Sequence, residues 1–208
     1  MIKYLLYTLV FIVINEGLLH SQETSNSDWQ LAKTKDEISI YTRKVNYSDY
    51  KEFKAEMIVN SKPDAIVIFL QNIDGYKEWL PDCLESKKLY QISSTEQINY
   101  LITDVPWPYE DRDIIYRFKV TKKNSKSGQF RILIENKPKY LDLKKNIVRI
   151  PNSLGFWVIT PISENQTKVV YQMHVEPGGY VPAWLANLKI VDTPYTFLYN
   201  LREQVEKN

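Results

Sequence analysis

The stretch EPGGYVPAWLAN, residues 176–187, separates two kinds of sequence pattern. Before it, apolar and polar residues alternate as in strands; after it, apolar residues recur with the period of a helix. Pro177, Gly178 and Gly179 interrupt the strand pattern, and Pro182 is suited to the first turn of a helix. The stretch therefore predicts the point at which a sheet ends and a final long helix begins.

After this boundary, five apolar residues follow one another at intervals of four, three, four and three positions, which places them on one helical face. They are Trp184, Leu188, Val191, Tyr195 and Leu198. We expect this face to cover the sheet, because a sheet cannot leave an apolar face open to water. Pro194 lies inside the predicted helix, where its ring and missing N–H predict a kink.

A series of short segments with strand-like alternation precedes the boundary. They cover residues 38–41, 53–59, 84–93, 97–104, 113–121, 129–136, 146–150, 155–161 and 167–176. The short turns between most of them favour antiparallel neighbours. Between the second and third segments, Pro63 begins a helix that Asp74 and Gly75 end, and a short turn follows. The sequence predicts an α+β domain with an antiparallel sheet of about nine strands.

Four stretches resemble the START family of lipid-transfer domains, and they occur in the family's order. They are Tyr76–Trp79, Val105–Pro108 followed by Arg112–Asp113, Ile147–Arg149, and residues 176–187. The similarity extends from about Trp29 to Val205. The resemblance implies the helix-grip fold, in which a curved antiparallel sheet wraps around a long C-terminal helix and short helices follow the second strand.

The resemblance also implies a function. In the family, an apolar tunnel between the sheet and the last helix holds a lipid, a sterol or a similar hydrophobic molecule. We therefore expect ligand binding, with transfer or sensing as possible uses, and no cofactor. An enzyme of the cyclase or aromatase type is the alternative, since such enzymes belong to the wider superfamily and need few acid–base groups. A third interpretation, an interaction domain with a filled core, predicts no cavity.

The period of the strands predicts which side chains face the ligand. On the strands they are Asn99, Leu101, Thr103, Tyr116, Phe118, Trp157, Tyr171 and Met173, and on the final helix Trp184, Leu188, Val191 and Tyr195. For each aromatic residue, packing in an ordinary core is an equally good interpretation. Asn99 and Thr103 carry more information, because a polar group on an apolar face needs a partner, which a ligand hydroxyl or water could supply.

The other reactive residues favour structure over catalysis. We interpret Arg112 as an anchor for the preceding turn, and Arg149 likewise as structural, because charges beside tight turns usually satisfy backbone groups. His174 alternates with the inward residues, so we expect it on the surface, without catalytic partners. Cys83 is the only cysteine, which rules out an intramolecular disulfide. With so few His and Cys residues, a zinc site of that kind is not expected.

The N-terminal residues differ from the rest of the chain. Lys3 precedes an apolar run from Tyr4 to Ile14, and a polar stretch begins after Gln22. This order predicts a signal peptide over residues 1–21 and a START-like domain over residues 22–208, in a secreted or periplasmic protein. A membrane anchor that is not cleaved is the alternative. The formal net charge of +2 argues against nucleic acid as a partner, and we expect a monomer with transient membrane contact.

We predict that the exported protein begins near Gln22 or Glu23, because signal peptidase removes the charged and apolar segments together. Intact-mass analysis of the exported protein measures this directly. A mass that still includes residues 1–21 would contradict cleavage and support the anchor.

Overall fold

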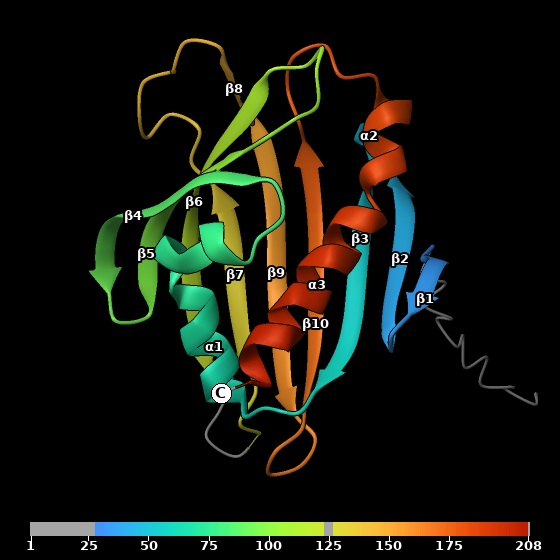
Figure 1. The fold of residues 1–208 in the computed structure, drawn as a ribbon, viewed down its shortest axis with the longest axis vertical. Helices are drawn as coiled ribbons and strands as arrows, with labels where there is room; N and C mark the ends of the chain where they lie inside the picture. The colour runs from blue at the N-terminus through green and yellow to red at the C-terminus, as the bar shows by residue number, and fades with distance from the viewer. Residues whose placement is uncertain (1–27, 123–126, 208) are drawn as a thin grey trace, which may run out of the picture.

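The computed structural model describes residues 28–122 and 127–207 (Figure 1). The predicted signal peptide lies outside the described residues. In chain order the elements are β1 (Gln30–Lys35), β2 (Ile38–Val45), β3 (Ser48–Val59), α1 (Pro63–Gln71), η1 (Ile73–Glu78), β4 (Cys83–Ser93), β5 (Glu96–Thr103), β6 (Asp111–Lys122), β7 (Phe130–Asn136), β8 (Ile147–Arg149), β9 (Asn152–Pro161), β10 (Thr167–Glu176), α2 (Ala183–Lys189) and α3 (Asp192–Val205).

Within the described residues, ten strands form one sheet in the spatial order β1-β2-β3-β10-β9-β7-β6-β5-β4, with β8 beside β6. Every pairing is antiparallel except the short β6–β8 pair. The predicted antiparallel helix-grip architecture is confirmed. The strand count is one higher than predicted because β1 was missed. Five of its six residues are exposed at the edge of the sheet, so it lacks the alternation that marks a half-buried strand.

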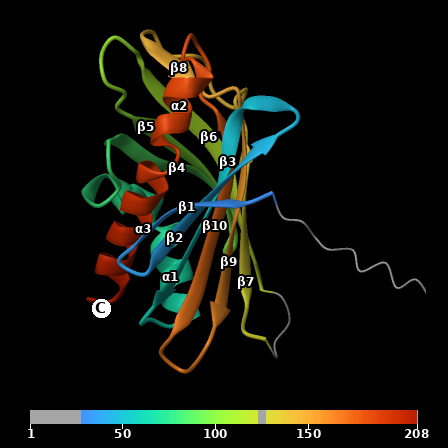
Figure 2. The same cartoon turned by 90° about the vertical axis from the view of Figure 1, so that its right-hand side faces the viewer.

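The molecule has two layers. All the helices lie against one face of the curved sheet, which we call the inner face (Figures 1 and 2). Pro63 and the acidic Asp64 stand in the first turn of α1, as the sequence predicts, and Ile66, Val67 and Leu70 are buried. The main core lies between the layers and joins α1, α3 and the inner face. A smaller apolar cluster of Ile98, Tyr100, Ile102 and Ile115 lies on the outer face.

The C-terminal segment is two helices, not one kinked helix. The break lies at Ile190 and Val191, and Pro194 is in the first turn of α3. Proline cannot donate to the carbonyl four residues earlier, which is that of Ile190, and its ring collides with that carbonyl. Helical bonding resumes when the N–H of Tyr195 donates to the carbonyl of Val191 at 3.4 Å.

The break changes the face that the helical segment presents to the sheet. Leu198, Leu201 and Val205 of α3 are buried, whereas α2 has no fully buried residue. Trp184 and Leu188 are 66% and 63% exposed. The prediction that these two side chains face the sheet was wrong, because the predicted stripe assumed one continuous helical phase across the break.

We predict that Leu198→Ala lowers the free energy of unfolding by about 2–5 kcal/mol, because it leaves a cavity beneath α3. Leu188→Ala is the matched control on α2 and should cost under about 1 kcal/mol, since its side chain is mostly in water. Urea unfolding of the two variants measures both values. Equal losses would contradict the difference in packing between α2 and α3.

Candidate functional site

The register of the sheet arranges inward side chains into rows that cross the strands. One row contains Gln97, Phe118, Ile134, Gly155, Met173 and Phe53. The row on one side contains Val120, Ile132, Trp157, Tyr171 and Ala55. The row on the other side contains Asn99, Tyr116 and Asn136, and continuing the register by one residue places Ser153 beside Asn136. All eight strand residues predicted for the site lie on this face.

An aromatic cluster fills the space between α3 and the sheet. The rings of Trp157 and Tyr171 are stacked with centroids 3.9 Å apart, and Phe197 of α3 lies 5.5 and 5.6 Å from them. Trp79 contacts Phe197 at 5.0 Å, and Phe53 contacts Tyr171 at 5.1 Å. Trp157 and Phe118 are almost completely buried. In this half of the inner face, the predicted site aromatics therefore act as core residues that pack the helix against the sheet.

The polar residues predicted for the site differ in how well they are satisfied. The Thr103 hydroxyl donates to the carbonyl of Arg112 at 3.4 Å. The Asn99 side chain is fully buried, and its Oδ1 accepts a bond from Nε2 of Gln97 at 2.9 Å. Its Nδ2 makes no hydrogen bond of ordinary geometry, and its polar neighbour is the Tyr116 hydroxyl. Burial raises the pKa of the adjacent Tyr116 hydroxyl, and the Asn99 amide lowers it by a smaller amount. Asn99 is therefore the predicted site residue with an unmet hydrogen-bonding need.

The site residues predicted on the C-terminal helices lie apart from one another. Val191 is half-buried and packs on the main core. The Tyr195 hydroxyl donates to the carboxylate of Asp36 in the β1–β2 turn, and Nζ of Lys33 lies 4.3 Å from the ring centroid. The bond to Asp36 raises the pKa of Tyr195 to about 12. Tyr195 thus attaches α3 to the β1–β2 turn, while Trp184 and Leu188 point outward.

Arg112 and Asp113 are adjacent in sequence but serve opposite faces of the sheet. The guanidinium of Arg112 donates to the carbonyls of Glu110 and Gly178, the second at 3.4 Å. It therefore links the β5–β6 loop to the start of the segment that leads into α2. Asp113 faces the outer side, so the two side chains cannot act together on one ligand.

Arg149 neutralises Asp113 in a buried pair on the outer face. Its Nε and Nη2 donate to the two carboxylate oxygens at 2.6 and 2.9 Å, and the Tyr100 hydroxyl donates to the same carboxylate at 3.1 Å. The remaining bonds of the guanidinium go to the carbonyls of Pro138, Leu141 and Asp142. This bidentate geometry holds the β7–β8 connection over the small apolar cluster. The contacts of Arg112 and Arg149 agree with a structural role for both.

His174 faces the outer side, as predicted, but its predicted surface location was wrong. The residue is 3% exposed because the ring of Tyr47, from the β2–β3 turn, covers it at a centroid distance of 5.2 Å. Nε2 lies 3.8 Å from a carboxylate oxygen of Glu176. Strand period gives the face of a residue but not what a distant turn lays over it.

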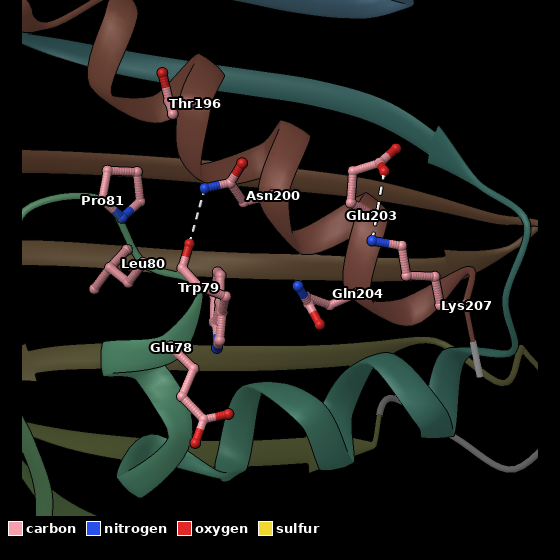
Figure 3. A pocket seen from close by; sticks show the side chains of 9 residues that line it. All are labelled: Glu78, Trp79, Leu80, Pro81, Thr196, Asn200, Glu203, Gln204 and Lys207. Atoms are coloured by element: carbon pink, nitrogen blue, oxygen red, sulfur yellow. Dashed lines mark hydrogen bonds and ion pairs between the residues drawn. The ribbon is translucent and has the colours of Figure 1, made fainter.

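A surface groove lies between α3 and the η1–β4 connection (Figure 3). It is lined by Glu78, Trp79, Leu80, Pro81, Thr196, Asn200, Glu203, Gln204 and Lys207. Nδ2 of Asn200 donates to the carbonyl of Trp79 at 2.8 Å, and Lys207 lies 3.8 Å from Glu203. None of the predicted site residues lines this groove. Its many charged and amide side chains suit water better than an apolar ligand.

Asn136 and Ser153 were missed by the sequence analysis. Asn136 was treated only as the end of a strand and Ser153 as part of a turn, whereas β9 begins at Asn152. The Oδ1 of Asn136 and the Oγ of Ser153 are buried without a hydrogen-bond partner. Extending the strand period by two residues would have placed Ser153 on the same face as Trp157.

No helix in the described ranges is long and apolar enough to cross a bilayer.

Comparisons with known proteins, by sequence and by structure, agree on one family. The model of the START domain matches residues 13–205. A STAR-related lipid transfer protein from Xanthomonas axonopodis is 37% identical, covers 86% of this chain and 98% of its own, and superposes with a TM-score of 0.80. Human phosphatidylcholine transfer protein is 22% identical over 81% of this chain and 79% of its own length.

A more distant likeness involves an enzyme. The Zhui aromatase/cyclase from a Streptomyces species has a TM-score of 0.54 at 14% identity and covers 75% of this chain and 93% of its own. At this identity the comparison shows a shared fold and nothing about activity.

We predict that Asp113→Asn lowers the free energy of unfolding by about 3–5 kcal/mol, because it leaves the Arg149 guanidinium buried without a counter-charge. Glu85→Gln is the matched control, since Glu85 pairs with Lys144 at 3.2 Å on the surface, and it should cost under about 1 kcal/mol. Thermal unfolding of the two variants compares them. A small loss for Asp113→Asn would show that the buried pair does not hold the β7–β8 connection.

Proposed function

The chain belongs to the START domain family, and we propose that it binds a hydrophobic ligand, a lipid or sterol-like molecule, between the inner face of the sheet and α2. The observation that carries the proposal is the chemistry of the inner face. On β5, β6, β7, β9 and β10, the positions from the row of Asn99 to the row of Trp157 hold only apolar and uncharged polar residues. Lys88, which pairs with Asn99 from the edge strand β4, is exposed. Such a surface favours an apolar ligand, because no charge has to lose its water when the ligand enters.

The helix α2 is a suitable cover for an entrance. Two polar bonds from α2 and one from the loop before it join this segment to β3. Oδ1 of Asn187 accepts from the N–H of Lys51 at 2.9 Å, Nδ2 of Asn187 donates to the carbonyl of Asp49 at 3.2 Å, and the Tyr50 hydroxyl donates to the carbonyl of Val181 at 2.9 Å. With no fully buried residue, α2 can leave the sheet at a small cost in apolar packing.

The helix α3 is held much more firmly. It contributes Leu198, Leu201 and Val205 to the core, and Lys33 pairs with Asp192 at 2.7 Å. Flexible points flank α2 instead, at Gly178 and Gly179, both with positive φ, and at the break around Ile190. We therefore expect the gate to be α2 and its flanking turns, while α3 stays in place.

Exposed aromatic residues at the same end suit a membrane encounter. Trp107 of the β5–β6 loop is 92% exposed and Tyr180 of the β10–α2 loop is 99% exposed, and both loops reach the end of the molecule where α2 lies (Figure 1). With Trp184 and Leu188 on the outer side of α2, they could contact the headgroup region while α2 opens. We propose a monomer that works outside the cytoplasm and exchanges its ligand in transient membrane contact.

An enzyme of the cyclase or aromatase type is the second candidate. The shared fold with an aromatase/cyclase is the observation in its favour. Against it, the positions of the inner face named above carry no paired carboxylates, and Asp113 is engaged on the outer face. Incubation with candidate polyketides separates the two, since turnover supports the enzyme and simple retention supports the carrier. We propose a non-enzymatic binding protein.

The proposed function is tested by native mass spectrometry of the protein purified from its source, followed by lipid extraction. We expect one lipid-sized hydrophobic molecule per chain, released on denaturation. A protein that carries no ligand, and takes none from mixed vesicles, would contradict the proposal and support an interaction domain with a filled core.

We predict that Asn187→Ala accelerates exchange of bound lipid about tenfold, because it removes two bonds, each worth about 0.5–1.5 kcal/mol, that hold α2 to β3. Asn200→Ala is the matched control, since Asn200 bonds the carbonyl of Trp79 from α3. Transfer of a fluorescent lipid between vesicles measures both rates. An unchanged rate for Asn187→Ala, or a larger effect for Asn200→Ala, would show that α2 is not the gate.

A further inference from the structure

A row of polar side chains crosses the otherwise apolar inner face. We call Asn99, Tyr116, Asn136 and Ser153 the polar row. Asn99 of β5 lies opposite Tyr116 of β6, and Tyr116 lies opposite Asn136 of β7. Ser153 of β9 follows Asn136 in the register, and Val175 of β10 lies opposite Ser153. At the other end, Lys88 of β4 pairs with Asn99. The four polar side chains thus come from four neighbouring strands and face the helices together.

Three atoms of the polar row are buried and lack a hydrogen-bond partner. They are Nδ2 of Asn99, Oδ1 of Asn136 and Oγ of Ser153. Asn99 is fully buried, and Ser153 is 3% exposed. Buried polar atoms in folded proteins are nearly always paired, because an unpaired one has lost its water without compensation. Nδ2 of Asn99 has the Tyr116 hydroxyl beside it, whereas Oδ1 of Asn136 and Oγ of Ser153 lack a partner altogether, which indicates a place for a polar group of the ligand.

The inward positions directly beside Tyr116, Asn136 and Ser153 carry no charge. The neighbouring inward positions hold Phe118, Ile134 and Met173 on one side and Leu101 and Ile114 on the other. Beside Asn136 and Ser153, a phosphate would be buried without an adjacent cation, and an ammonium group would be buried without a carboxylate. The nearest cations stand at the ends of this region. Arg112 lies two inward positions beyond Tyr116, past Ile114; its Nη atoms donate to the carbonyls of Glu110 and Gly178, while its Nε is buried without a partner. Lys88 of β4, which pairs with Asn99, is exposed.

The available atoms match a group that both donates and accepts. The Asn99 amide nitrogen donates, the Asn136 oxygen accepts, and the Ser153 hydroxyl does either. We propose that the polar row binds the uncharged hydroxyl of a neutral amphiphile, with the hydrocarbon part lying along the apolar inner face toward α2. This inference rests on the proposed function and specifies the chemical class of its ligand.

Three amphiphiles with the same C16 tail test the proposal: 1-hexadecanol, hexadecyl phosphate and hexadecyltrimethylammonium. Each is titrated below its micelle concentration against the full exported protein, and displacement of a bound fluorescent fatty alcohol gives the dissociation constant. We expect hexadecanol to bind at least about tenfold more tightly than either charged analogue, since burial of an unpaired charge is costly.

Variants of the polar row assign this preference to its side chains. We expect Asn136→Leu and Ser153→Ala each to weaken hexadecanol binding about three- to tenfold while leaving the weaker binding of the charged analogues unchanged. Thr160→Ala, a substitution near the other end of β9, is the control and should not alter the preference. Far-UV circular dichroism and thermal unfolding confirm that each variant is folded. The comparison of the three amphiphiles on the unaltered protein does not depend on the folding of any variant.

The outcomes separate this inference from the proposed function. Equal binding of all three amphiphiles, or tighter binding of hexadecyl phosphate, would overturn the neutral class while leaving lipid binding intact. If Asn136→Leu and Ser153→Ala both kept the full preference for hexadecanol, water would be the partner of the polar row and the inference would fail. If no amphiphile bound, the proposed function itself would be contradicted.

Discussion

The antiparallel register of β5, β6, β7, β9 and β10 is the constraint on which the rest of the structure depends. Because side chains alternate between the two faces, a single register decides which residues meet the helices. It places the aromatic cluster beneath α3 and the polar row beyond it. A slip of one residue in any of these strands would turn its inward set toward water and bring charges such as Arg117 or Lys168 to the inner face.

The two C-terminal helices are attached to the sheet unequally. Pro194 divides one apolar segment into α2 and α3, and only α3 inserts side chains deeply into the core. The same molecule therefore combines a rigid half, where stacked rings fill the interior, with a half whose cover depends on a few polar bonds. A binding protein needs both, because a ligand can enter only where the fold opens at low cost.

Much of the fold followed from sequence pattern, because strand period is a local property. The faces of Asn99, Tyr116, Phe118, Trp157, Tyr171 and Met173 were predicted correctly for that reason. The errors at Trp184 and Leu188 arose from a helix break whose position depends on the carbonyl that Pro194 obstructs. The error at His174 came from Tyr47, which approaches from a turn more than a hundred residues away in the chain. Asn136 and Ser153 are neighbours on the inner face only because of the register between β7 and β9, which the periodicity of a single strand does not predict.

We propose above that an apolar ligand occupies the inner face beneath α2. The most direct measurement uses a hexadecanol analogue that carries a photoreactive diazirine in its chain, crosslinked to the protein and mapped by peptide mass spectrometry. A ligand in this position gives crosslinks to inward residues of β5, β9 and β10, such as Leu101 and Met173, and to the sheet-facing side of α2. Crosslinks confined to the groove around Thr196 and Lys207, or to the outer face of the sheet, would contradict it.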